Sequence, residues 1–167
     1  MNTPDLGIIA TAWLTGFGYV LAVCIRLRQG SWTVWAARCW LFGACLMLVH
    51  VVVAFHFRHQ WSHAAAVIDT ARQTKELMGW EWGGGVWLNY LLVLIWLGDA
   101  LWLTLAKESY LTRAKWLSMA TQGYLAFMWF NATVVFGTMG AKVFGVGAIV
   151  VMLWSQRQAK ATKQTTP

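Results

Sequence analysis

All four histidines of this 167-residue chain lie between positions 50 and 63, in the run HVVVAFHFRHQWSH. If this run forms one helix, His56, His59 and His63 stand at i, i+3 and i+7 and share a face, while His50 points about a third of a turn away. Imidazole nitrogen is a good ligand for copper, zinc and iron. The spacing therefore predicts a transition-metal site on one helical face.

Two acidic residues farther along the chain are candidates to complete such a site. We expect Glu81 to act as a ligand or to hold a ligand histidine in place, with Asp69 as the other candidate. Three nitrogen ligands would leave an open position at copper or zinc. The alternative is that His59 and His63 are polar residues at the end of a helix, and that His56 bonds to a backbone carbonyl or to Glu81.

His50 belongs to a second candidate site, deeper among the apolar residues. At about 1.5 Å of rise per residue, His50, Asn89, Tyr90 and Asn131 reach similar depths in three separate segments. Polar groups inside a bilayer are costly unless they have partners, so this layer is a candidate site. One interpretation is a haem b bound by His50, with Met128 as a second ligand; the other is a histidine bonded to Asn89 or Asn131.

The composition is typical of a membrane protein. The chain is 59% hydrophobic and 11% charged, with a mean hydropathy of +0.52, whereas soluble domains are about one quarter charged. The net charge of +7 comes from basic residues between and beyond the apolar blocks. Such residues orient membrane helices, so we expect a lipid bilayer as partner and no nucleic acid.

The apolar blocks predict an all-α bundle of five transmembrane helices, or four if the last does not cross fully. They form a single domain over residues 1–156. The expected spans cover about residues 6–25, 35–57, 86–106, 116–136 and 143–154. Residues 62–78 alternate small, apolar and charged side chains, which predicts an amphipathic helix on the outer face. We expect the basic tail, 157–167, to be disordered.

The distribution of Lys and Arg predicts the orientation of these spans. With five spans and an external N-terminus, the cytoplasmic side receives Arg26, Arg28, Arg38, Lys107, Arg113, Lys115, Arg157, Lys160 and Lys163. The outer side receives Arg58, Arg72, Lys75 and Lys142. This excess on one side places the basic C-terminus in the cytoplasm and the histidines outside, in a bacterial inner membrane facing the periplasm.

Asp99 lies near the cytoplasmic end of the third expected span. An acidic residue at such a position is a candidate proton relay. The alternative, which we favour, is a structural ion pair with Arg38, which enters the membrane from the same side.

These patterns predict a multi-pass membrane protein with a histidine-based metal site at its outer face and a role in redox chemistry or electron transfer. The alternative is a non-catalytic structural or assembly subunit of a larger membrane complex, or a homo-oligomer. Small residues that allow close helix packing favour that alternative; they are Gly18 and Ala22 in the first span and Gly145, Gly147 and Ala148 in the last. Sequence motifs of nucleophilic hydrolases and of nucleotide-binding loops are absent.

Overall fold

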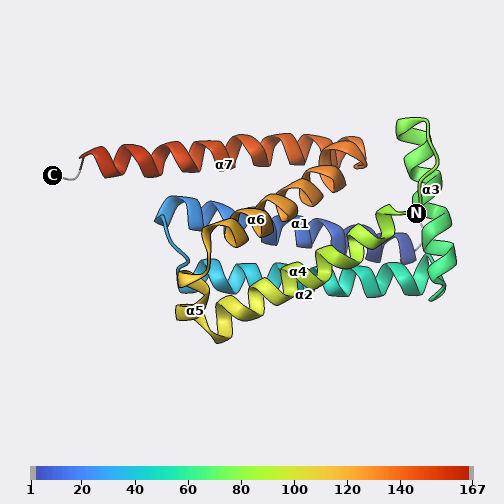
Figure 1. Cartoon of the computed structure of the whole chain (residues 1–167). Coiled ribbons are helices and arrows are strands. Elements are labelled where there is room, and N and C mark those ends of the chain that lie inside the picture. The colour runs from blue at the N-terminus through green and yellow to red at the C-terminus, as the bar shows by residue number, and fades with distance from the viewer. Residues whose placement is uncertain (1–2, 166–167) are drawn as a thin grey trace.

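The computed structural model describes residues 3–165, and every regular element in that range is a helix (Figure 1). The all-α class predicted from the sequence is therefore confirmed. Among these described residues, four helices are long and apolar enough to cross a membrane, as is typical of an integral membrane protein. They are α1 (Thr3–Gln29), α2 (Val34–Phe57), α4 (Gly85–Leu105) and α7 (Met139–Thr165).

The long helices run between two ends of the molecule, each marked by a shorter helix (Figure 1). Helix α3 (His63–Met78) lies across one end, close to the N-terminus, and α5 (Lys107–Thr112) lies at the other. We call these the α3 end and the α5 end. Helix α1 packs against α2 and α7, α2 packs against α4, and α4 packs against α6 (Lys115–Phe130).

Local capping sets the boundaries of the elements next to the histidines. The hydroxyl of Thr33 accepts a hydrogen bond from the Ala36 amide and begins α2. The hydroxyl of Ser62 does the same for Ala65 and begins α3. Helix α3 ends at Gly79, whose φ of 79° is readily adopted only by glycine. The observed α2 and α4 match the expected spans 35–57 and 86–106 closely.

The fourth expected span, 116–136, consists of α6 followed by a π-helix, η1 (Asn131–Val135). The amide of Phe136 donates to the carbonyl of Asn131, five residues back, as a π-helix requires. The chain then turns at Gly137, where a Cβ atom would collide with the Thr133 carbonyl oxygen. The regular helix is thus interrupted between η1 and α7.

The basic segment from residue 157, expected to be a disordered tail, is helical in the structure as far as residue 165. Helix α7 continues to Thr165, well beyond the expected span 143–154. The residues that follow Trp154 include Gln, Ala, Lys and Arg, all good helix formers, so an established apolar helix extends through them. Residues 166–167 lie outside the described range.

The core is aromatic and is held together by a close crossing of α1 and α2. A Cβ atom on Gly18 would lie 3.0 Å from the Cα atom of Gly43, so these glycines allow the two backbones to touch. Trp96 of α4 covers the same point, since a Cβ on Gly43 would meet its ring at 2.8 Å. Buried Tyr19 and Trp40 surround Trp96, with ring centroids within 5.7 Å of it.

Candidate ligand cavity

The predicted row of three histidines depends on a continuous helix, and the helix is interrupted. Helix α2 ends at Phe57, and the chain then turns through Gln60 and Trp61, which have positive φ angles of 48° and 60°. Left-handed backbone at two successive non-glycine residues changes the chain direction sharply. His56 therefore ends one helix and His63 begins another, with His59 in the turn.

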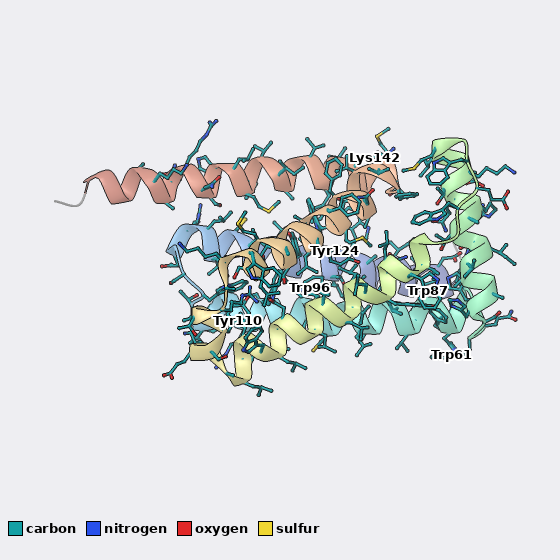
Figure 2. The ribbon with its side chains drawn as sticks, in the orientation of Figure 1. Trp61, Trp87, Trp96, Tyr110, Tyr124 and Lys142 are labelled. Carbon is teal, nitrogen blue, oxygen red and sulfur yellow. The ribbon has the colours of Figure 1, made fainter. Side chains whose placement is uncertain are left out.

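Each of these histidines has a different neighbour. The Trp61 indole donates to Nδ1 of His56 at 3.2 Å, and Nδ1 of His63 lies 2.9 Å from the Tyr90 hydroxyl. Partial burial lowers the pKa of His59, and Arg58 adds to this effect, while the charge of Asp69 opposes it. Figure 2 shows Trp61 and Trp87, close neighbours of His56 and His63, at the α3 end.

The acidic residues proposed as further ligands form ion pairs instead. Glu81 accepts from Lys75 at 3.1 Å. Asp69 accepts from Arg72 at 2.6 Å and pairs with Arg58 at 3.5 Å. Partial burial raises the pKa of Asp69, but hydrogen bonds and charge from these two arginines outweigh that effect and bring the pKa below its ordinary value.

The metal-ligand set is therefore not assembled. Within residues 3–165, no group of three His, Cys, Asp or Glu side chains is arranged so that it could hold a metal ion. A metal site at His56, His59, His63 and Glu81 remains a prediction from the sequence, and this geometry gives it no support.

Unlike the proposed metal ligands, the four residues of the polar layer predicted around His50 are brought together, because all four line one cavity. A cavity of about 930 Å³ opens inside the α3 end, and His50, Asn89, Tyr90 and Asn131 all contribute to its wall. Its wall comes from α1, α2, α3, α4, α6 and η1. Ligand pockets in proteins span about 300–1,000 Å³, so this cavity is large enough for a small organic molecule.

Helix α3 covers the cavity with one face. The lining residues of α3 are Ala66, Asp69, Thr70, Gln73, Thr74 and Met78, whose spacing is that of a single helical face. The opposite face carries exposed Ile68 and Arg72. The following loop packs tightly beneath α3, since a Cβ on Gly83 would lie 2.6 Å from the Val67 side chain. Glycine at this position lets the loop approach α3.

Most of the deeper wall is apolar. The lining residues from α1, α2, α4 and α6 include Ile8, Val51, Ala54, Phe55, Leu92, Phe127 and Met128. His50 lies among them, with its Nδ1 atom 3.0 Å from the hydroxyl oxygen of Thr11 on α1. Trp80 and Trp82 also line the cavity, and their rings stack with centroids 5.8 Å apart. The cavity thus combines an apolar interior with a few polar groups, which is typical of ligand sites.

The α5 end holds the acidic residue Asp99, and the expected ion pair of Asp99 with Arg38 is wrong. Asp99 bonds to Arg113, not to Arg38, whose guanidinium lies over the Trp35 ring at 5.3 Å. Arg113 directly follows α5, and this short helix brings the Arg113 side chain back against Asp99 on α4. The sequence did not indicate that the chain after α4 folds back in this way. Both side chains of the pair are buried, with 3% and 4% exposure.

Two more side chains complete this cluster. The indole of Trp40 donates to Asp99 at 2.9 Å, and the hydroxyl of Tyr110 donates to the same carboxylate oxygen at 3.0 Å. Arg113 also donates to the Tyr110 hydroxyl and to Ser118. Burial, reinforced by the charge of Asp99, raises the pKa of Tyr110, so its phenol keeps its proton and remains a donor. Figure 2 shows Tyr110 at the α5 end.

Sequence reasoning missed Thr11 and the lining face of α3 as parts of the site. The i, i+3, i+4, i+7 spacing in 66–74 was a usable signal for that face. Nothing in the sequence indicated Thr11, because its contact with His50 depends on how α1 and α2 cross.

A comparison of this chain with protein-family models, curated proteins and solved structures found no match.

Proposed function

We propose that this chain is a membrane-embedded binding protein that holds an amphiphilic small molecule in the cavity at the α3 end. The observation that carries this proposal is the cavity of about 930 Å³, to which six helical elements contribute. Apolar residues dominate its interior, and polar residues of α3 cover it. A molecule with an apolar body and a small polar group matches that distribution.

We further infer that the chain crosses the membrane five times, with the α3 end on the outer side. Helices α4 and α7 run in the same direction (Figure 1), so the segment between them has to return from the α5 end to the α3 end. At about 1.5 Å per residue, the residues of α6 and η1 (115–135) span roughly 30 Å, the thickness of a hydrocarbon core. The excess of Lys and Arg at the α5 end supports a cytoplasmic location for that end.

The amphipathic character of α3 fits the same arrangement. Its cavity face is small and polar, and its exposed Ile68 and Leu77 suit the boundary between lipid headgroups and water. In this proposal α3 lies on the outer surface and closes the cavity from above.

Filling the cavity tests the proposal. Ala54 lines the cavity, whereas Ala126 of α6 is exposed and does not. We expect native mass spectrometry of the purified protein to detect a retained amphiphile in the wild type and in Ala126→Trp, and much less in Ala54→Trp. Thermal unfolding identifies any variant that fails to fold. Equal retention by both variants would contradict the proposal, as would a wild type that neither retains nor takes up any amphiphile.

Haem b is a second candidate for the same cavity, because His50 and Met128 line it from different helices. Either side chain can ligate haem iron, and such a cofactor would supply electron-transfer chemistry. An absorption spectrum of the purified protein tests this: a Soret band that disappears in His50→Ala supports it, and no band at all contradicts it. The role as a subunit of a larger complex remains a prediction, tested by co-purification of partner chains.

A further inference from the structure

The bonding of His50 indicates what kind of polar group the cavity accepts; this inference rests on the proposed function. The Thr11 hydroxyl has one proton, and its oxygen lies 2.8 Å from the Gly7 carbonyl and 3.0 Å from the Ile8 carbonyl. A threonine hydroxyl in a helix commonly donates to such a carbonyl. With its proton used there, the Thr11 oxygen is an acceptor toward His50, so Nδ1 of His50 carries a proton and donates.

This bond determines the state of the other ring nitrogen. In a neutral imidazole, protonated Nδ1 leaves Nε2 with a lone pair. Within residues 3–165, the hydrogen bonds of the His50 ring go to α1, to the Thr11 hydroxyl through Nδ1 and to the Ile8 carbonyl, which lies 3.0 Å from that same hydroxyl oxygen. Nε2 is on the other side of the ring from Nδ1, and the side chain lines the cavity. An acceptor nitrogen therefore borders an apolar space, with its tautomer set by Thr11 on the neighbouring helix.

Asn131, another polar residue at this level, also has an acceptor. The side-chain amide of Asn131 donates to the Phe127 carbonyl at 2.8 Å, which leaves its own oxygen as an acceptor. The lining residue Arg58 is a cation, but it is paired with Asp69. Together with Asp5, which also lines the cavity, these charges disfavour an anionic headgroup.

We propose that the ligand is a neutral amphiphile with a hydroxyl group, and that this hydroxyl donates a hydrogen bond to Nε2 of His50. Quinol headgroups and aliphatic alcohol lipids share this chemistry. A protonated amine is the other donor class, but at the level of His50 its charge would be buried among apolar residues.

Two matched probes isolate the hydroxyl. 4-Octylphenol has the donor, and 4-octylanisole has the same ring and chain with a methyl group in place of the proton. One neutral hydrogen bond contributes about 0.5–1.5 kcal/mol, or roughly 2- to 12-fold in affinity. In wild-type protein in lipid nanodiscs, we expect the phenol to bind more tightly than the anisole by that factor. In His50→Ala the two should bind equally.

His56→Ala is the matched control, since His56 is exposed and lies outside the cavity wall. It should keep the full preference for the phenol. Thr11→Val provides a second variant that retains His50 but removes the acceptor for Nδ1, and it should reduce the preference without abolishing it. Because these comparisons use affinity ratios, a modest loss of stability does not produce the expected pattern.

Nitrogen NMR of histidine-labelled protein observes the bond directly. The His50 signals, identified by their absence in His50→Ala, should show protonated Nδ1 and unprotonated Nε2. The Nε2 resonance should shift with 4-octylphenol and not with 4-octylanisole. Protonated Nε2, or equal shifts with both probes, would overturn the proposal.

Two further probes distinguish the sources of the chemistry and the rival donor. Binding of 1-decanol with the same dependence on His50 supports aliphatic alcohols, and binding of the phenol alone supports a quinol-like ring. Tighter binding of octylamine than of the phenol overturns the inference. If phenol and anisole bind equally, and Ala54→Trp blocks both, only this inference fails. If Ala54→Trp blocks neither, the proposed function fails with it.

Discussion

The two ends of the helical bundle treat polar side chains in opposite ways. At the α5 end, Asp99 and Arg113 are almost fully buried and bond to each other, and Trp40 and Tyr110 supply further hydrogen bonds. At the α3 end, His50 and Asn131 border a cavity of about 930 Å³ and each presents an acceptor to it. At the α5 end the polar groups bond to one another, whereas at the α3 end they border a space large enough for a ligand.

This difference separates a structural role from a binding role. A buried charge is tolerated when its partners satisfy it, and its removal then destabilises the fold. A polar group with unused bonding capacity in an apolar cavity adds little to stability, but it can bond to a ligand. Substitutions at the α5 end should therefore alter stability most, and those at the α3 end should alter binding.

The largest loss of stability is expected for Arg113→Ala. It leaves the Asp99 carboxylate buried without its cation, which typically destabilises a protein by about 3–5 kcal/mol. Denaturant unfolding in detergent micelles, followed by circular dichroism, measures this loss.

The double variant Asp99→Asn with Arg113→Ala serves as the control. Asparagine keeps an oxygen that can accept from Trp40 and Tyr110 but carries no charge, so much of the lost stability should return. If the double variant is as unstable as Arg113→Ala, then contacts of Arg113 with Ser118 and Tyr110, and not its charge, account for the loss.

The two ends also differ in how far the sequence predicted them. Hydropathy was enough to predict α2 and α4. The polar layer of His50, Asn89, Tyr90 and Asn131 could also be predicted, because depth along a helix follows from residue number. The three-histidine face depended on a helix that continues past Phe57, and α2 ends there, so the metal site remains a prediction from the sequence. The pair of Asp99 with Arg38 failed because depth alone does not determine which of several arginines a packed loop brings inward.

A smaller effect is expected for Tyr110→Phe. It removes the donor to Asp99 and the acceptor for Arg113 but leaves the ion pair, so the loss should be about 1.5–3 kcal/mol. The same unfolding measurement applies. A loss as large as that of Arg113→Ala would mean that the phenol, and not the guanidinium, is the main partner of Asp99.

At the α3 end, Thr11→Val should have less effect on stability than either change. It removes one hydrogen bond between α1 and α2, which corresponds to about 0.5–1.5 kcal/mol. Unfolding followed in parallel with Tyr110→Phe checks the ranking. A larger loss for Thr11→Val would show that the bond to His50 holds α1 against α2, as the closed cluster does at the other end.

The smallest effect is expected from the ion pairs that hold α3. The pKa of Asp69 lies below its ordinary value, so the charged form stabilises the fold. That contribution is complete above the unfolded-state pKa of about 3.9 and is lost as the pH falls through the lower folded-state value. Exposed ion pairs contribute about 0–1 kcal/mol to stability, so the global free energy of unfolding should change little. We expect the effect of pH to appear mainly as local opening of α3, which these pairs hold.

Hydrogen exchange of the α3 amides in wild type and Asp69→Asn measures this contribution. At pH 7, the α3 amides of the variant should exchange slightly faster than those of the wild type, because the variant lacks the pairs with Arg58 and Arg72. Below the folded-state pKa of Asp69, the two proteins should exchange alike, since both then have a neutral side chain at this position. A difference that persists at low pH would show that Asp69 holds α3 by hydrogen bonds that survive protonation. In that case, the cover of the cavity would resemble the closed cluster of the α5 end more than an open binding site.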